Sequence, residues 1–175
     1  GNGTSLSFYD DQSLPLDMVP TDLAMGDLNQ DQMIDFAVVS KESNRLSLFY
    51  MDRSLEPILR QDLDIDDEPN LVRIADLNQD QKPEVIVGYV DPPYHIHIFD
   101  FSSTPNGTRT QIDQMGVNLR DLEFIDLNQD GHLDLVGLSY ADDHLTLALG
   151  RGDFTFERPH YVFVDEDPTD FVIDD

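Results

Sequence analysis

The sequence predicts an all-β protein made of four-stranded antiparallel units of the β-propeller type. The pentapeptide DLNQD occurs at 27–31, 76–80 and 126–130, so the chain repeats with periods of 49 and 50 residues. Each repeat holds four short runs rich in strand-forming residues, and none shows the periodicity of a helix. Four antiparallel strands in about 40–50 residues are typical of one propeller blade. A parallel β-helix would show a much shorter period.

The four runs follow one another in the same order in every repeat. An apolar run precedes the pentapeptide, at 23–25, 71–75 and 122–125. A β-rich run follows it, at 35–40, 84–90 and 134–140. A third, alternating run lies at 45–51, 94–101 and 144–150, and a looser fourth run lies at 55–63, 108–115 and 154–164. In 45–51, Leu46, Leu48 and Tyr50 alternate with other residues, which predicts a half-buried strand.

Alignment of the repeats divides the chain into three full units and two partial ones. The full units are 19–67, 68–117 and 118–166. Residues 1–18 align with the last strand of a unit, and 167–175 align with the first strand of a further unit. Partial units leave strand edges that can pair with another strand. We therefore expect a segment of a longer repeat protein, or a chain that pairs with copies of itself in an oligomer or filament.

The composition narrows the possible partners. The chain has 10 basic and 36 acidic residues, a formal net charge of −26. This charge argues against nucleic-acid binding, which needs Lys and Arg, and against anionic membranes, and it favours cations. The absence of Cys excludes disulfides, cysteine zinc sites and thiol catalysis. No apolar run is long enough for a membrane helix, and the polar start at 1–4 shows no signal peptide.

The loops that begin with DLNQD carry the strongest chemical signal. These acidic loops read DLNQDQMID (27–35), DLNQDQKPE (76–84) and DLNQDGHLD (126–134). Side-chain oxygens at positions 1, 3, 5 and 9 and the carbonyl of position 7 suit Ca²⁺, with Mg²⁺ as second choice. The predicted ligands are Asp27, Asn29, Asp31, Met33 and Asp35; Asp76, Asn78, Asp80, Lys82 and Glu84; and Asp126, Asn128, Asp130, His132 and Asp134.

A hairpin cap and an EF-hand are the alternatives to such a loop site. Asp and Asn could simply cap a hairpin turn, but three copies in register argue against that interpretation. An EF-hand would need a Glu at position 12 and flanking helices. Position 12 is Val38, Val87 and Gly137, inside predicted strands, so the EF-hand is excluded.

With three such loops, the sequence resembles the FG-GAP/VCBS repeats of integrin α-subunit propellers and of many secreted repeat proteins. The resemblance implies that each loop joins the innermost strand of a blade to the second strand. Position 6, usually Gly in a left-handed conformation, is Gln32, Gln81 and Gly131. A non-Gly residue there costs about 1 kcal/mol, so the third loop is expected to be the best formed. Glu84 follows Pro83, which is expected to alter its reach.

Three smaller features remain. N-glycosylation sequons begin at Asn2 and Asn106, both in the expected turn between third and fourth strands, and both asparagines are expected to carry N-glycans. Arg151-Gly152-Asp153 is interpreted as an ordinary turn rather than as an integrin ligand. His95 and His97 would face a metal together, but with no third ligand evident they are interpreted as an exposed polar strand face.

No catalytic constellation is visible, so the leading hypothesis is a non-catalytic extracellular module. In it Ca²⁺ at about three sites rigidifies the blades, and other proteins or copies of the chain are the partners in adhesion or structural assembly. A lectin-like propeller is one alternative, although Tyr50, Tyr94 and Tyr140 do not occupy matching positions and Trp is absent. An accessory propeller of a larger enzyme is the other.

Overall fold

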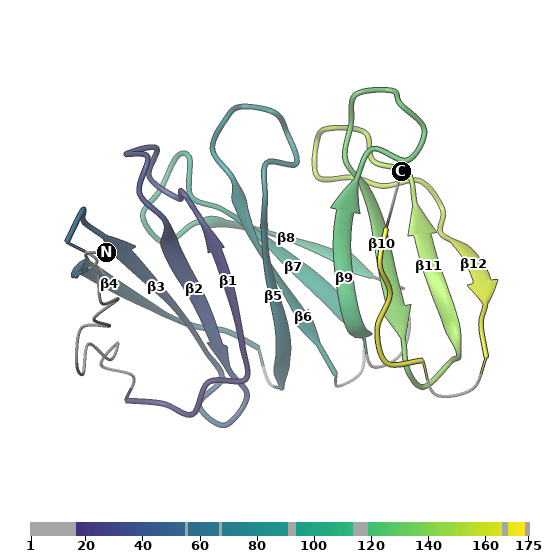
Figure 1. Ribbon diagram of the computed structural model, residues 1–175, viewed down its shortest axis with the longest axis horizontal. Helices are drawn as coiled ribbons and strands as arrows, with labels where there is room; N and C mark the ends of the chain where they lie inside the picture. The colour runs from purple at the N-terminus through teal and green to yellow at the C-terminus, as the bar shows by residue number, and fades with distance from the viewer. Residues whose placement is uncertain are drawn as a thin grey trace, which may run out of the picture.

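The computed structural model describes residues 17–54, 56–66, 68–90, 94–113, 119–165 and 168–173 (Figure 1). Within these ranges the protein is all-β, with three four-stranded antiparallel sheets and no helix. None of the described residues forms a helix long and apolar enough to cross a membrane. The prediction of an all-β protein with four-stranded antiparallel units is therefore confirmed.

Each sheet is a meander in which neighbouring strands in sequence pair with each other. The first sheet comprises β1 (Asp22–Gly26), β2 (Asp35–Ser40), β3 (Arg45–Met51) and β4 (Pro57–Asp64). The second comprises β5 (Pro69–Ala75), β6 (Glu84–Tyr89), β7 (His95–Asp100) and β8 (Thr108–Asp113). The third comprises β9 (Leu119–Ile125), β10 (Asp134–Ser139), β11 (His144–Ala148) and β12 (His160–Phe163).

Two segments differ from the expected strands. The predicted strand at 154–164 is reduced to β12 and an isolated bridge between Gly150 and Phe156. Residues 168–173, expected to begin a further unit, contain no strand. Residues 1–16 and 174–175 of the predicted partial units lie outside the described residues.

The middle strands are buried on both faces, which corrects the expectation of a half-buried strand at 45–51. Leu46, Ser47, Leu48 and Phe49 are all fully buried in β3. Leu46 and Leu48 pack against the second sheet, whereas Ser47 and Phe49 point the other way and pack against Met18. One apolar cluster joins the first and second sheets through residues such as Leu48 and Val87. A second cluster joins the second and third sheets, for example through Ile86 and Leu135.

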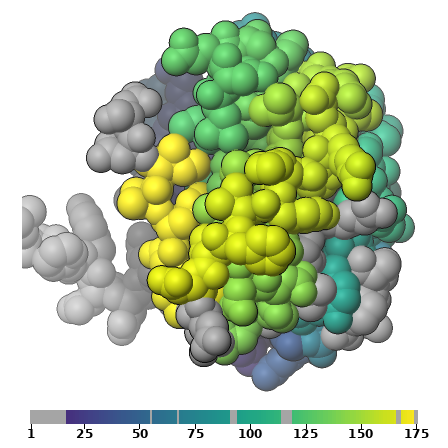
Figure 2. All heavy atoms as spheres, turned by 90° about the vertical axis from the view of Figure 1, so that its right-hand side faces the viewer, coloured from purple at the N-terminus to yellow at the C-terminus, as the bar shows by residue number. Residues whose placement is uncertain are grey.

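The first strands of the three sheets lie next to one another. Strand β1 contacts β5, and β5 contacts β9. Beyond β9, Phe171, Val172 and Ile173 line a small cavity together with residues 123–125 of that strand. Figure 2, seen from the side of the third sheet, shows this yellow end of the chain lying against the sheet. The three sheets therefore form a row with their first strands on a common side.

Candidate metal sites

The three acidic loops occupy the same place in their sheets. Each connects the first strand to the second: β1 to β2, β5 to β6, and β9 to β10. All predicted ligands therefore lie in equivalent connections, at the upper edge of the row in Figure 1. This position agrees with the one that the FG-GAP/VCBS resemblance implies.

Backbone amides fold each loop around its own carboxylates. In the first loop, Asp27 accepts hydrogen bonds from the N–H groups of Asp31 at 3.1 Å and Gln32 at 2.8 Å. The Oδ1 atom of Asp31 accepts the Met33 N–H at 2.8 Å. The same bonds recur in the other two loops, at lengths within 0.1 Å of these. Identical side chains at positions 1, 3 and 5 thus produce one loop conformation three times.

Two residues in every loop adopt the left-handed backbone conformation. At position 6 they are Gln32, Gln81 and Gly131, with φ of 68°, 72° and 93°. The expected conformation is therefore formed even where the residue is Gln. Position 4 is left-handed as well, with φ of 64°, 61° and 61° at Gln30, Gln79 and Gln129. This second strained position was not predicted from the sequence.

The position-9 carboxylates are the buried part of each loop. Asp35, Glu84 and Asp134 are 0% exposed. One oxygen of each accepts the N–H of the position-2 leucine, at 2.8–3.0 Å. The other oxygen of Asp35 accepts the Met51 N–H at 2.9 Å, and that of Asp134 accepts the Gly150 N–H at 2.8 Å. The Oε1 atom of Glu84 is buried without a hydrogen-bond partner in the described structure.

The second loop therefore carries the least compensated buried charge. Burial, followed by smaller contributions from the nearby carboxylates Asp100, Asp76 and Asp80, raises the pKa of Glu84 to about 7, against the lowering effect of the Leu77 N–H. Burial also raises the pKa of Asp35. Isolated buried carboxylates are costly unless a proton or a cation neutralises them. An all-oxygen donor set around such a charge fits Ca²⁺.

Neighbouring loops are connected by the glutamine at position 4. Gln30 donates from Nε2 to the carbonyl oxygen of Gln81 at 2.7 Å. Gln79 donates in the same way to the carbonyl oxygen of Gly131. Both bonds run from position 4 of one loop to position 6 of the next. The recurrence of Gln at this position was the only signal of this contact in the sequence.

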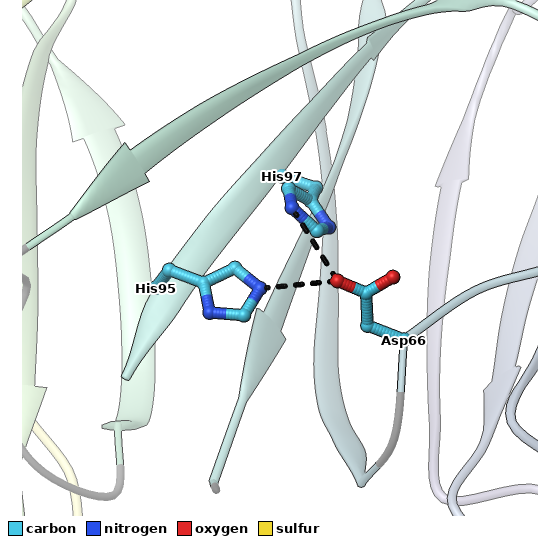
Figure 3. Close-up of side chains that lie close together, drawn as sticks. All are labelled: Asp66, His95 and His97. Carbon is cyan, nitrogen blue, oxygen red and sulfur yellow. Dashed lines mark ion pairs between the residues drawn. The ribbon is translucent and has the colours of Figure 1, made fainter. Parts of the chain in front are cut away.

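A second kind of candidate site lies away from the loops. In the described part of the chain, one group of three Asp, Glu or His ligand atoms lies within 4.8 Å of one another, and it comprises Asp66, His95 and His97 (Figure 3). His95 is 6% exposed and His97 is 0% exposed. The interpretation of these histidines as an exposed strand face was therefore wrong. Packing of the first sheet against the second buries them, and Asp66 supplies the third group that the sequence had not indicated.

The remaining predicted features are the second glycosylation sequon, the Arg151-Gly152-Asp153 turn and three tyrosines. Asn106 is exposed in the connection between β7 and β8, whereas Asn2 lies outside the described residues. Gly152 has φ of 72°, and Asp153 accepts hydrogen bonds from Thr155, so Arg151-Gly152-Asp153 forms a tight turn. Tyr50 lies in β3, whereas Tyr94 and Tyr140 lie in connections, so these rings do not form a repeated platform.

The fold and the loops define a class of all-β repeat protein in which every sheet carries one acidic loop. Residues 27–87 match the family described as the FG-GAP-like repeat. This stretch contains the first and second acidic loops, and the match agrees with the resemblance seen in the sequence. A comparison with curated proteins found no match.

Proposed function

We propose that this chain is a non-catalytic, calcium-binding module of the β-propeller type that serves structural assembly or adhesion outside the cell. The observation that carries the proposal is the threefold recurrence of one oxygen-lined loop, at the same connection of each sheet and with a buried carboxylate at its base. The FG-GAP-like repeat at 27–87 supports the same conclusion.

The row of first strands favours the propeller arrangement. In a propeller the innermost strands of successive blades line a common axis. Strands β1, β5 and β9 lie next to one another in that order, as neighbouring innermost strands would, and residues 171–173 lie beside β9. We propose that further blades continue the row and that 171–173 corresponds to the first strand of one of them.

Calcium would act as a clamp within each sheet. The predicted ligands at positions 1, 3, 5, 7 and 9 all belong to one loop, so an ion bound there would fix the turn between the first two strands. Carboxylates that repel one another in the absence of metal would be neutralised. Because the ion binds the folded loop and not the unfolded chain, it would stabilise the fold by mass action.

The calcium proposal is tested by thermal melting with excess Ca²⁺ and with a chelator, together with calorimetric titration. We expect about three ions per chain and a higher melting temperature with Ca²⁺. The triple variant Asp31→Asn, Asp80→Asn, Asp130→Asn should lose most of this gain, because each loop loses the charge at position 5. Glu42→Gln, an exposed acidic residue outside the loops, is the matched control and should keep it. An unchanged melting temperature on chelation would overturn the proposal.

Exposed apolar side chains at the first and third sheets favour assembly with a partner chain. Phe163 is 80% exposed and Val172 is 88% exposed, both beside the third sheet. Met25 and Ile58 of the first sheet are also exposed. Exposed apolar groups of this kind are common where a protein packs against a partner. Light scattering after size-exclusion chromatography in Ca²⁺ tests self-assembly, and a monodisperse monomer would rule it out.

Extracellular location is tested through Asn106. Its exposed turn is accessible to glycosylation, and the sequon is intact. Secretion from a eukaryotic host should give a glycan at Asn106 that is visible by intact mass and absent from Asn106→Gln. A secreted wild-type chain of unmodified mass would contradict the expected glycoprotein.

A further inference from the structure

We propose that Asp66, His95 and His97 form a binding site for a zinc-class divalent ion, distinct from the acidic loops. Asp66 lies in the connection between β4 and β5, and the two histidines lie on the same face of β7. Figure 3 shows both imidazole rings directed at the Asp66 carboxylate. The site therefore joins the connection that leaves the first sheet to a middle strand of the second.

The distances fit a bridging ion better than direct hydrogen bonds. The Nε2 atoms of His95 and His97 lie 3.7 and 3.8 Å from the same oxygen, Oδ2 of Asp66. An N–H···O hydrogen bond is about 2.7–3.2 Å long. A tetrahedral zinc ion with bonds of about 2.0–2.1 Å holds its ligand atoms about 3.4 Å apart. A contraction of a few tenths of an ångström would thus bring each histidine nitrogen to this distance from Asp66, and all three ligand atoms already lie within 4.8 Å of one another.

The buried ring of His95 also points to a bound ligand. Its side chain is more than nine-tenths buried, and neither ring nitrogen has a hydrogen-bond partner in the described structure. A buried polar group left without a partner costs about 1–3 kcal/mol. Coordination through Nε2 would remove that cost at the nitrogen that faces Asp66.

The surroundings hold the other two ligands in place. The Tyr89 hydroxyl lies 3.0 Å from Nδ1 of His97, where its oxygen can accept the ring N–H and leave Nε2 free for a metal. Arg109 donates to Oδ1 of Asp66 at 2.9 Å, so Oδ2 is the oxygen that remains for the histidines. The Tyr89 ring also stacks on His95, with ring centres 4.6 Å apart.

A fourth position is available for an amide oxygen or water. The Oε1 atom of Gln111 lies 3.2 Å from Nε2 of His97. Its amide nitrogen donates to Asp113 at 2.7 Å, which keeps the oxygen directed toward the histidine. Asp66 is 44% exposed, so solvent also reaches the site. Three protein ligands and one exchangeable position are found in tetrahedral zinc sites of the open kind, whereas closed sites have four protein ligands.

The donor atoms of this site favour a different metal from that of the acidic loops. Ca²⁺ takes oxygen ligands, whereas imidazole nitrogen favours zinc and its transition-metal neighbours. The register equivalents of His95 and His97 are Arg45 and Ser47 in β3, and His144 and Thr146 in β11. The pair of histidines therefore occurs in β7 and not at the equivalent positions of β3 and β11. We infer that the bound ion ties the β4–β5 connection to β7 in a chain that has no disulfide.

The site is tested with Co²⁺ as a spectroscopic probe and Zn²⁺ as competitor. The protein is stripped with a chelator and dialysed into excess Ca²⁺, so that the loops are filled before titration. We expect one Co²⁺ per chain with the intense visible absorption of a four-coordinate ion, displaced by one equivalent of Zn²⁺. Zn²⁺ should also raise the melting temperature, because it binds only the folded chain.

Three variants decide the assignment. Asp66→Asn and His95→Gln should each weaken Co²⁺ binding at least about tenfold. His144→Gln removes a similarly buried histidine at the equivalent position of β11 and should bind as the wild type does. The Asp66 side chain is partly exposed, so Asp66→Asn should melt like the wild type in chelator, which keeps the test valid if His95→Gln does not fold.

Two results would overturn the site: no four-coordinate Co²⁺ spectrum, or binding that Asp66→Asn and His95→Gln leave unchanged. The triple loop variant separates this proposal from the calcium proposal, because it should lose Ca²⁺ and keep Zn²⁺. Loss of Zn²⁺ in that variant would place the ion in the loops and contradict the proposed site.

Discussion

Arg73 of β5 donates a hydrogen bond from Nη1 to Oδ2 of Asp22 in β1, at 3.0 Å. The same guanidinium forms an ion pair with Asp121 of β9 and donates to the Leu122 carbonyl oxygen at 2.7 Å. One side chain therefore connects the first strands of all three sheets. The same Oδ2 atom of Asp22 also accepts the Val72 N–H at 2.9 Å. Two hydrogen bonds from β5 therefore end on one carboxylate oxygen of β1.

Removing this arginine should destabilise the packing of the sheets. We expect Arg73→Met to lower the free energy of unfolding by about 2 kcal/mol, because hydrogen bonds to charged groups are lost and two partly buried carboxylates remain. Urea denaturation measures the change. Arg151→Met is the control, since Arg151 forms an exposed pair with Glu157 at 3.6 Å and such pairs contribute about 0–1 kcal/mol. Equal effects of the two substitutions would contradict a connecting role for Arg73.

The glutamines at position 4 should couple neighbouring loops. Gln30→Ala and Gln79→Ala each remove a bond to the next loop, and we expect each to cost about 0.5–1 kcal/mol. Gln129 has the same left-handed backbone, and its side chain has no partner among the described residues. Gln129→Ala is therefore a control for the backbone and should be close to neutral. Equal losses in all three variants, measured by urea denaturation, would assign the effect to the backbone instead.

Glycine should be the more stable residue at position 6 in both the second and the third loop. Gln81 has φ of 72°, so Gln81→Gly should gain up to about 1 kcal/mol by relieving the left-handed conformation. Gly131 has φ of 93°, and an added Cβ would meet nothing within 4 Å. Gly131→Ala should therefore lose about 1 kcal/mol through backbone strain alone. Thermal melts in chelator check both values, and a loss on Gln81→Gly would indicate that its side chain stabilises the loop.

The effect of Glu84→Gln on the melting temperature should change sign when calcium is added. In chelator near pH 8 we expect a higher melting temperature than wild type, because the substitution removes a buried charge whose Oε1 atom has no partner. In excess Ca²⁺ we expect a lower one, because a ligand is lost. Asp134→Asn is the matched comparison. Both Asp134 oxygens accept backbone N–H groups, so that variant should be destabilised under both conditions. A gain for Glu84→Gln in Ca²⁺ would remove Glu84 from the ligand set.

Much of the fold was predictable because it depends on short stretches of sequence. The predicted runs at 35–40 and 45–51 coincide with β2 and β3. The alternation of apolar residues and the turn residues between runs determine strands locally. The left-handed conformation at Gln32 and Gln81 was also predictable, because position 6 is usually a left-handed Gly in the repeats that the sequence resembles. Burial was predicted less well, since the polar residues Ser47 and His97 are fully buried. The packing of the first sheet against the second covers His97, whereas Met18 contacts Ser47 on the other face of the first sheet.

By itself the sequence determined the repeat, its four strands and the acidic loop of each unit, because all of these form within a few residues of one another. Only the tertiary structure decided which distant residues meet. Asp66 lies in the connection between β4 and β5 and His95 in β7, and Arg73 and Asp22 lie in different sheets. Their contacts depend on how one sheet packs against the next, and no local pattern records that packing. The loops could therefore be found by their spacing, whereas the cluster of Asp66, His95 and His97 could be found only in the folded chain.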